Sequence, residues 1–570
     1  MKPLSRARPL WLRSVRVELL LFGVFALLVL GLGIGLRDPW PSDEPRFALV
    51  ARLMVEHGQW LFPHRGAELY PDKPPVFMWL QALGYLVTGS WRVAFLLPSL
   101  LAGMGALALV YDLARRLWNH RSALLAALTL LVTIHFTYQM RNAQIDPLLL
   151  GWVTLANYGL LRHLLLGPSW RWFAVGCFFA GLGVATKGVG VIALLMLIPY
   201  VIARRGRWQH VALAHGGWRW AGGLAMFFVP ILGWLLPMLL VAHSDGDAQH
   251  AEYVQNILFG QTVHRYAAPS GHFHSPFYFL GIILVDWLPL SLLLPWALPA
   301  WWRRLKRRDA RFLLPLGWIV LVLLFFSLSP GKRDVYILPA LPMTALALAP
   351  LLPGLLRIAN IRRLIFSLTL LLSLGATAGA LLALLKHPRW AVAIEQSLAP
   401  QIWWMLLSIG VAGLVVAGVT RVRRAALGWL LFATVLWGVY GLWGYPMLNG
   451  DRSARDVMQR ARAIAGPVDT IGLLAWKEQN LLMAPGPVAE FGFLKAWPAQ
   501  YADAVAWQNE APAHRWIFSL DTAMGQCVDR RKASHVGHAN RRDWWMFRSD
   551  AVRPGCIPQA LETSDSSDMQ

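Results

Sequence analysis

The stretch that decides the fold stands at the amino terminus: KPLSRARPLWLRSVR at residues 2–16, then VELLLFGVFALLVLGLGIGL at residues 17–36. The second segment is apolar over about the 20 residues that a helix needs to cross a bilayer. The first segment holds five basic residues and no acid. Because basic residues stay on the cytoplasmic side of a span, the pattern predicts an uncleaved anchor with a cytoplasmic N-terminus.

Composition extends this conclusion to the whole chain. The 570 residues are 56% hydrophobic and 15% charged, with 30 Trp. Soluble proteins carry about 25% charged residues. The chain is therefore an integral membrane protein, and a single soluble globule is excluded. Its three Cys show no spacing typical of zinc sites.

Hydropathy predicts thirteen spans. Short polar breaks at Thr186–Gly188 and Ser329–Asp334 each divide a longer apolar run into two spans, because a helix of about 30 residues would be near 45 Å long and exceed the bilayer. The thirteen spans are expected at residues 17–36, 91–111, 123–140, 145–162, 172–186, 189–203, 221–242, 277–300, 312–328, 336–353, 364–385, 402–420 and 425–445.

Charge supports this topology. The segments predicted to be cytoplasmic hold 26 Lys and Arg and three acids, whereas the outer segments hold 13 of each and residues 449–570 hold 14 of each. The inner face thus accounts for the whole net charge of +23. Insertion topology explains this charge, so it gives no reason to expect a nucleic-acid partner.

The predicted fold is an all-α polytopic membrane protein with a small C-terminal α/β domain outside the cytoplasm. Its parts are a basic N-terminus (1–16), a membrane domain (17–448) with a large first periplasmic loop (37–90), and a periplasmic domain (449–570) with a disordered end. In the last domain a helix is expected at Arg452–Ala465, and strands at Thr470–Trp476, Arg515–Leu520 and Asp543–Arg548.

Two cysteines, Cys527 and Cys556, fall in the predicted periplasmic domain. That compartment is oxidising, so we expect them to pair and to close a loop of about 30 residues, worth roughly 3–4 kcal/mol. Two unpaired thiols are the alternative.

Polar residues of possible chemical use gather on the outer side. Asp43 and Glu44 precede an amphipathic segment, Arg46–His57, that predicts a helix along the membrane surface. Acids also cap helices, and this alternative applies to Asp43, to Glu44 and to Asp146, which begins a span.

Three lysines, Lys73, Lys187 and Lys332, lie at outer ends of spans, against the positive-inside trend. An ammonium near the headgroup plane is a good partner for a phosphate, and snorkelling of the side chain to the lipid headgroups is the alternative. No cofactor is required by the pattern. A divalent metal shared by Asp72 with His264 or His274 is a weak alternative, because the spacing matches no specific site.

This arrangement fits a reaction on a lipid-linked phosphate. Cations stabilise a departing phosphate, and a carboxylate accepts a proton from an attacking hydroxyl. The sequence shows no Walker A or Rossmann motif, so the energy source outside the membrane would have to be lipid-borne.

These residues resemble motifs of the GT-C superfamily of polyprenyl-phosphate-dependent glycosyltransferases. The strongest similarity is to the bacterial transferases that place 4-amino-4-deoxy-L-arabinose on lipid A and to protein-mannosyltransferase-like relatives. The motifs that carry the resemblance are Asp43-Glu44-x-Arg46-Phe-Ala, Gly58-x-Trp60-x-x-Pro63-His64, Tyr70-x-x-Lys73-Pro74, Gln144-x-Asp146-Pro147, Ala185-Thr-Lys187-Gly188, His264-Arg265-Tyr266 and Gly331-Lys332 followed by Tyr336-Ile-Leu-Pro339. Arg333 and Asp334 depart from the aminoarabinose members, which have Leu and Pro there.

The resemblance implies a GT-C-like fold and a role for each matching residue. A sugar on undecaprenyl phosphate would be transferred at the periplasmic face of the bacterial inner membrane, with inversion. The implied acceptor is lipid A and the implied sugar aminoarabinose-like; a protein or another envelope glycan is the alternative acceptor. The implied roles are catalysis by Asp43 and Glu44, binding of the donor phosphate by Arg46, Lys73, Lys187, Arg265 and Lys332, and lining of the cavity by Tyr70, Asp146 and Tyr336.

Two other classes of protein remain as alternatives. A secondary transporter would place its ionisable residues near the middle of the bilayer, whereas here they lie at its outer boundary. A protein that binds an envelope polymer would depend on the C-terminal domain rather than on Asp43 and Lys73.

Overall fold

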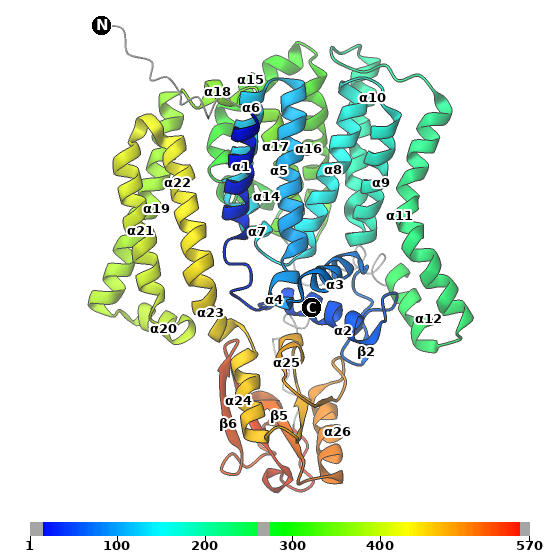
Figure 1. Cartoon of the computed structure of the whole chain (residues 1–570), viewed down its shortest axis with the longest axis vertical. Coiled ribbons are helices and arrows are strands. Elements are labelled where there is room, and N and C mark those ends of the chain that lie inside the picture. Colours follow the sequence, from blue (N-terminus) through cyan, green and yellow to red (C-terminus); the bar gives the residue numbers. More distant parts are fainter. Residues whose placement is uncertain (1–14, 260–273, 559–570) are drawn as a thin grey trace.

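The computed structural model describes residues 15–259 and 274–558, in three layers along the long axis (Figure 1). A broad bundle of helices forms the first layer. Helices of the first outer loop form a thin middle layer, and a small mixed α/β domain at the C-terminal end forms the third (Figure 1). The predicted disordered end lies outside the described residues.

The membrane layer consists of helices at each position where the sequence predicts a span. Their bounds are α1 Val15–Gly31, α5 Leu97–Leu117, α6 His120–Leu131, α7 Ile134–Met140, α8 Ile145–Leu165, α9 Trp170–Lys187, η2 Val189–Met196, α10 Leu197–Arg205, α11 Gly217–Ser244, α14 Tyr278–Val285, η4 Leu290–Leu293, α15 Leu294–Lys306, α16 Ala310–Leu328, η5 Asp334–Ile337, α17 Ala340–Leu348, α18 Leu352–Leu355, α19 Ala359–Lys386, α21 Ile402–Thr420, η6 Val422–Arg424, α22 Ala425–Val439, η7 Tyr440–Gly444 and α23 Tyr445–Arg452.

By length and composition, six helices of the described residues can each cross a membrane, or eight if each of two bent pairs is one span. The bent pairs are α6 with α7, at 67°, and α14 with η4 and α15, at 95°. The chain is thus a multi-pass membrane protein. Several predicted spans are short or broken here, so the count of thirteen stays a prediction.

The break between α9 and η2 has a local cause. Gly188 adopts a φ of 79° and ends α9. A Cβ at Gly190 would clash with the backbone of Gly183, so glycine lets η2 fold back against α9. This break leaves Lys187 at the end of a helix.

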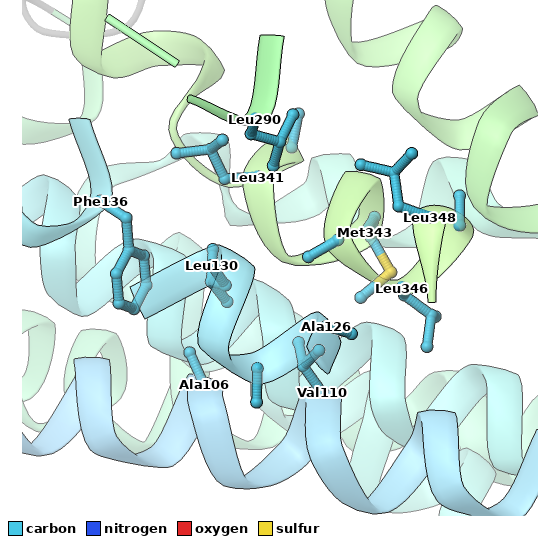
Figure 2. Packing of buried hydrophobic residues seen from close by; sticks show 14 of the residues in the cluster. Ala106, Val110, Ala126, Leu130, Phe136, Leu290, Leu341, Met343, Leu346 and Leu348 are labelled. Atoms are coloured by element: carbon cyan, nitrogen blue, oxygen red, sulfur yellow. The ribbon is translucent and has the colours of Figure 1, made fainter. Parts of the chain in front are cut away.

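Small apolar side chains pack the centre of the membrane layer. Helix α17 is buried along its whole length and lies against α5 and α6. Figure 2 shows this packing around Ala106 and Val110 of α5, Ala126 and Leu130 of α6, Phe136 of α7, Leu290 of η4, and Leu341, Met343, Leu346 and Leu348 of α17.

The first outer loop folds into short elements rather than an extended chain. They are α2 Glu44–His57, the hairpin β1 His64–Arg65 with β2 Glu68–Leu69, α3 Val76–Thr88 and α4 Trp91–Ala94. Helix α2 begins close to the predicted Arg46 and ends at His57, as predicted. Its face that holds Phe47 and Val50 is buried.

The C-terminal domain holds a five-stranded sheet in the order β4-β3-β5-β7-β6. Strand β3 is parallel to β4 and β5, whereas β7 is antiparallel to β5 and β6. The elements are α24 Arg455–Ala465, β3 Thr470–Leu474, α25 Glu478–Met483, β4 Val488–Glu490, α26 Trp497–Glu510, β5 Arg515–Leu520, α27 Asp521–Met524, β6 Ser534–Ala539, β7 Arg542–Phe547 and η8 Ser549–Ala551. The three predicted strands correspond to β3, β5 and β7, and β4 and β6 are additional.

Two further features hold this domain in place. Cys527 and Cys556 form a disulfide. One hydrophobic cluster includes Phe47 and Phe77 of the first loop together with Leu473 and Phe518 of the sheet. The loop and the domain therefore share a core.

Helices α12 Ala248–Gln255 and α20 Arg389–Leu398 lie at the two outer edges of the membrane layer (Figure 1).

Candidate active site

Asp43 stands at the N-terminus of α2, but its side chain makes no capping hydrogen bond. Its Oδ2 lies 3.6 Å from an Nη of Arg333, and the side chain keeps 19% of its surface exposed. Helix capping, the alternative explanation for this acid, therefore does not occupy the carboxylate. The carboxylate forms an ion pair with Arg333 and is still accessible.

Glu44 has a different environment from its neighbour. Its carboxylate is buried and accepts two hydrogen bonds from Arg37, one of them at 2.8 Å, and further bonds from the backbone N–H groups of Trp40 (2.9 Å) and Ala143 (2.8 Å). The guanidinium of Arg37 is itself buried among the rings of Trp40, Phe95 and Tyr445. Glu44 thus ties three segments of the chain together and has no acceptor position left for a substrate.

Three of the predicted residues meet from three elements. Lys187, at the end of α9, places its Nζ 2.5 Å from Oδ1 of Asp146, at the start of α8. The same Nζ lies 5.2 Å from the ring centre of Tyr336, in η5. Both members of the ion pair are only slightly exposed.

The turn that leads into η5 carries three charged residues, and each of them contacts a different partner. The buried Lys332 donates to the carbonyls of Ser329 (2.6 Å) and His274 (3.0 Å), so two of its three donors hold the turn. Arg333 faces Asp43, whereas Oδ2 of Asp334 lies 3.7 Å from Nε2 of His135. Neighbours in sequence, Arg333 and Asp334 thus serve different partners.

Two other predicted residues lie where the first loop meets the C-terminal domain. Nε of Arg46 donates to Glu478 of α25 at 3.0 Å. Burial alone would lower the pKa of Arg46, but the nearby Tyr70 and Glu478 outweigh it and raise that pKa. Tyr70 is fully buried, and burial raises the pKa of its phenol. The structure places both side chains inside the interface.

Lys73 stands immediately before α3 and donates to the carbonyl of Asp72 at 3.2 Å. The Asp72 carboxylate lies 4.0 Å from Arg65. His274 stacks on Tyr278, with ring centres 4.3 Å apart. His264 and Arg265 lie outside the described residues. Within residues 15–259 and 274–558, no group of three or more His, Cys, Asp or Glu side chains is arranged to hold a metal.

Asp38 joins the three layers at the start of the first loop. It accepts hydrogen bonds from Arg92 (2.9 Å), Asn449 (3.0 Å), Ser453 (2.9 Å) and Arg455 (2.6 and 2.8 Å). Burial would raise the pKa of Asp38, but these hydrogen bonds outweigh it and hold that pKa well below its usual range. Asp38 stays ionised and anchors the loop.

An apolar groove of about 430 Å³ runs beneath α3, between the outer parts of α5 and α8. On α3 the lining begins at Leu80, seven residues after Lys73, and on α8 it begins at Leu148, two residues after Asp146. Its walls include Leu83, Gly105 and Trp152. The groove therefore starts near the polar residues and leads away from them among apolar side chains.

Sequence analysis missed several side chains that build this region. Arg37 and Glu478 contact the predicted residues Glu44 and Arg46, whereas His135 and Gln139 contact Asp334, to which the sequence assigned no role. Only Arg37 carried a signal, because it is a basic residue at the outer end of the first span, against the positive-inside trend.

Comparison with known proteins defines the class. The family model described as dolichyl-phosphate-mannose-protein mannosyltransferase matches residues 72–234. ArnT from Cupriavidus metallidurans, solved with undecaprenyl phosphate bound, superposes with a TM-score of 0.73 over 95% of this chain and all of that one, at 20% identity. The archaeal oligosaccharyltransferase AglB from Archaeoglobus fulgidus superposes with a TM-score of 0.50 over 90% of this chain and 70% of that one, at 13% identity. The fold is that of the GT-C membrane glycosyltransferases.

Sequence relatives narrow the class to a family. Undecaprenyl phosphate-α-4-amino-4-deoxy-L-arabinose arabinosyl transferases are 30% identical in Pectobacterium carotovorum, over 67% of this chain and 69% of the relative. The relative from Pseudomonas aeruginosa is 31% identical, over 76% of this chain and 75% of the relative. The chain belongs to this family of arabinosyl transferases. It is therefore a multi-pass membrane glycosyltransferase of the bacterial inner membrane.

Proposed function

We propose that this enzyme transfers an aminoarabinose-like sugar from undecaprenyl phosphate to lipid A. Transfer takes place at the periplasmic face of the inner membrane. The proposal follows from the family, whose named members are undecaprenyl phosphate-α-4-amino-4-deoxy-L-arabinose arabinosyl transferases. It is supported by an accessible carboxylate, Asp43, on the same side of the bundle as the Asp146–Lys187 pair and the groove.

The observation that carries the catalytic assignment is the state of Asp43. A carboxylate that only capped α2 would bond to the first backbone N–H groups of the helix, and Asp43 does not. An acid beside the reacting centre activates an acceptor hydroxyl as a general base. A phosphate acceptor needs no base, and in that case Asp43 orients the reacting groups. We assign Glu44 a positioning role, because Arg37 and two backbone N–H groups occupy its carboxylate.

The cations act on the leaving group. In a single displacement the acceptor oxygen bonds to the anomeric carbon as the bond to undecaprenyl phosphate breaks, which inverts the configuration. Lys73, together with Arg265, is assigned to hold the departing phosphate, because a fixed cation stabilises the charge that develops there. Lys187, which lies beside Asp146 and Tyr336, is assigned to bind the same phosphate. Lys332 and Arg46 support this set by fixing the η5 turn and the interface.

The groove beneath α3 is assigned to the isoprenoid chain of the donor. It is apolar, runs along α3 from Leu80, on the helix that follows Lys73, and is lined by the outer parts of α5 and α8. Its volume lies within the range of ligand pockets. A lipid whose phosphate sits at Lys73 can lay its first isoprene units along the groove.

The topology that goes with this function has thirteen spans. With the N-terminus in the cytoplasm, an odd number of spans puts residues 449–570 in the periplasm, where the Cys527–Cys556 disulfide suits the oxidising compartment. The proposed boundaries are residues 1–16, 17–448 and 449–570, with the first periplasmic loop at 37–90.

Mass spectrometry of lipid A tests the proposal. A deletion strain is compared with the same strain complemented by the wild-type gene, by Asp43→Asn and by Asp503→Asn, an exposed acid of the C-terminal domain paired with Lys495. We expect the pentosamine mass on lipid A with the wild type and with Asp503→Asn. Asp43→Asn should reduce it at least about 100-fold at equal protein level.

Unchanged lipid A in the deletion strain would contradict lipid A as the acceptor. Analysis of envelope proteins and other glycolipids from the same strains then decides between the remaining acceptors. Full modification by Asp43→Asn would instead contradict the assignment of Asp43 and leave the family assignment intact.

A further inference from the structure

Two broken helices meet beside the proposed site. The bend between α6 and α7 faces the break between α14 and η4, where the backbone N–H groups of Ile134 and His135 donate to the carbonyls of Leu288 and Asp286, each at 2.9 Å. The η5 turn closes over this junction and brings Asp334 to it. Polar groups of three separate segments thus collect in one corner of the outer membrane layer.

Within this corner, polar side chains are buried without hydrogen-bond partners among the described residues. His135 is 3% exposed, and neither of its ring nitrogens hydrogen-bonds to an atom of residues 15–259 or 274–558. In the same part of the chain, the Oε1 of Gln139, one turn further along α7, has no partner either. Both side chains approach the carboxylate of Asp334. Its Oδ2 lies 3.7 Å from Nε2 of His135 and 3.5 Å from Nε2 of Gln139. Buried polar atoms are costly unless something binds them.

The corner also holds two acidic residues. The backbone carbonyl of Asp286 accepts the N–H of His135, and the Asp334 carboxylate lies 3.7 Å from the ring of the same histidine. Among the described residues, neither forms an ion pair with Lys or Arg, whereas Asp43 faces Arg333 and Asp146 pairs with Lys187. The side chain of Asp334 is 42% exposed, so its charge is open to a ligand. Helix α7, which carries His135 and Gln139, leads directly into α8, whose first turn holds the Asp146 of the Asp146–Lys187 pair.

We propose that this corner, formed by Asp334, His135, Gln139 and Asp286, binds the ammonium group of the sugar on the lipid-linked donor. The inference rests on the proposed function and adds the residues that select a cationic sugar. An ammonium donates three hydrogen bonds. The Asp334 carboxylate, a ring nitrogen of His135 and Oε1 of Gln139 offer three acceptors, and Asp286 adds charge. A sugar with a hydroxyl in the same position leaves two carboxylates uncompensated, so the site discriminates against it.

The test uses the purified full chain in lipid nanodiscs with two synthetic donors. The donors share the same polyprenyl phosphate and pentose and differ only in an amino or a hydroxyl group at one carbon. Transfer to lipid A is followed for the wild type, for Asp334→Asn and for Asp286→Asn. Asp503→Asn is the matched control. Binding of the polyprenyl phosphate without sugar is measured in parallel.

We expect the wild type to prefer the amino donor about 10- to 100-fold in kcat/KM, the value of a charged hydrogen bond. Asp334→Asn should lose most of this preference through a higher KM for the amino donor, and Asp286→Asn part of it. Binding of the sugar-free polyprenyl phosphate should not change. Asp334→Glu should recover part of the preference, which separates loss of charge from misfolding.

The inference is overturned if the wild type shows no preference for the amino donor. It is also overturned if the preference survives in both Asp334→Asn and Asp286→Asn while the protein transfers sugar. A wild-type protein that transfers neither pentose overturns the proposed function itself, so the two failures are distinguishable.

Discussion

Two adjacent acids, Asp43 and Glu44, show how strongly a single position decides what a side chain can do. Asp43 faces Arg333 and remains partly exposed, whereas Glu44 is buried in a bidentate pair with Arg37 and accepts two backbone hydrogen bonds. Both are acids at the start of one helix, so their sequence context is nearly the same. Their roles separate only because the chain around Arg37 closes over Glu44.

Glu44→Gln is expected to destabilise the protein. The substitution leaves the buried Arg37 without a counter-ion, which costs about 3–5 kcal/mol. Thermal unfolding of the detergent-solubilised protein should show a clearly lower midpoint, and activity should fall with it. Glu56→Gln removes an exposed partner of Arg52 and should cost less than about 1 kcal/mol. A Glu44→Gln protein of normal stability with a reduced kcat would instead support a catalytic role for Glu44.

At the scale of elements, helix α3 connects the polar site to the membrane. It follows directly after Lys73-Pro74-Pro75 and ends at Gly89, and it forms the roof of the groove above α5 and α8. Leu83 and Val87 of α3 are exposed on the groove side. Since such side chains are stable next to lipid, the helix can lie over a lipid chain.

Gly105→Phe tests the groove without touching the polar residues. A Cβ at Gly105 meets no atom within 4 Å, so a larger side chain projects into free groove volume. We expect the KM for a full-length undecaprenyl donor to rise about tenfold, the effect of roughly 1.4 kcal/mol. A donor with only two or three isoprene units should be affected much less.

The control for this experiment is Gly375→Phe. Gly375 lies on α19, and a Cβ there also meets no atom within 4 Å. It should leave the KM of both donors unchanged. If Gly105→Phe affects long and short donors equally, the isoprenoid chain of the donor does not bind in this groove.

On the scale of the whole molecule, the C-terminal domain and the first loop form one unit. They share a hydrophobic cluster, the Arg46–Glu478 pair and the anchor at Asp38. A further contact joins β4 to the β1–β2 hairpin, where the carboxylate of Glu490 accepts the backbone N–H of Ala67. Because the loop carries Asp43 and Lys73, the position of the domain also sets the geometry of the site.

The contact between Glu490 and Ala67 makes the stability of the protein depend on pH. Burial raises the pKa of Glu490 to about 7, with the N–H of Ala67 opposing the shift and the nearby Glu68 adding to it. The folded protein therefore holds this proton more tightly than the unfolded chain. Its contribution to stability is present in full below a pH of about 4.5 and is lost as the pH rises through 7. We expect the unfolding midpoint to fall between pH 5.5 and 8 by the equivalent of about 1–2 kcal/mol.

Glu490→Gln keeps an acceptor for Ala67 and removes the ionisable group. Its unfolding midpoint should be nearly flat over this range and higher than that of the wild type at pH 8. If the variant retains the full pH dependence, other groups are responsible and the contact is not the titrating element.

The sequence by itself determined the class of this protein. The basic segment before residues 17–36, the low charge content and the motifs around Asp43, Lys73 and Asp146 indicate a polytopic glycosyltransferase. Strands β3 and β5 and helix α2 follow from local patterns, as does the pairing of Cys527 with Cys556. These features depend on residues near in sequence or on the compartment, so no tertiary contact is needed to predict them.

Tertiary structure decided which polar residues act together. Glu44 meets Arg37, Arg46 meets Glu478, and Arg333 and Asp334 turn to different partners. His135 and Gln139 gained significance only when the η5 turn brought Asp334 beside them. Such pairings join segments up to several hundred residues apart. Burial and charge compensation across these distances depend on how the helices pack, and periodicity and spacing along the chain do not encode that packing.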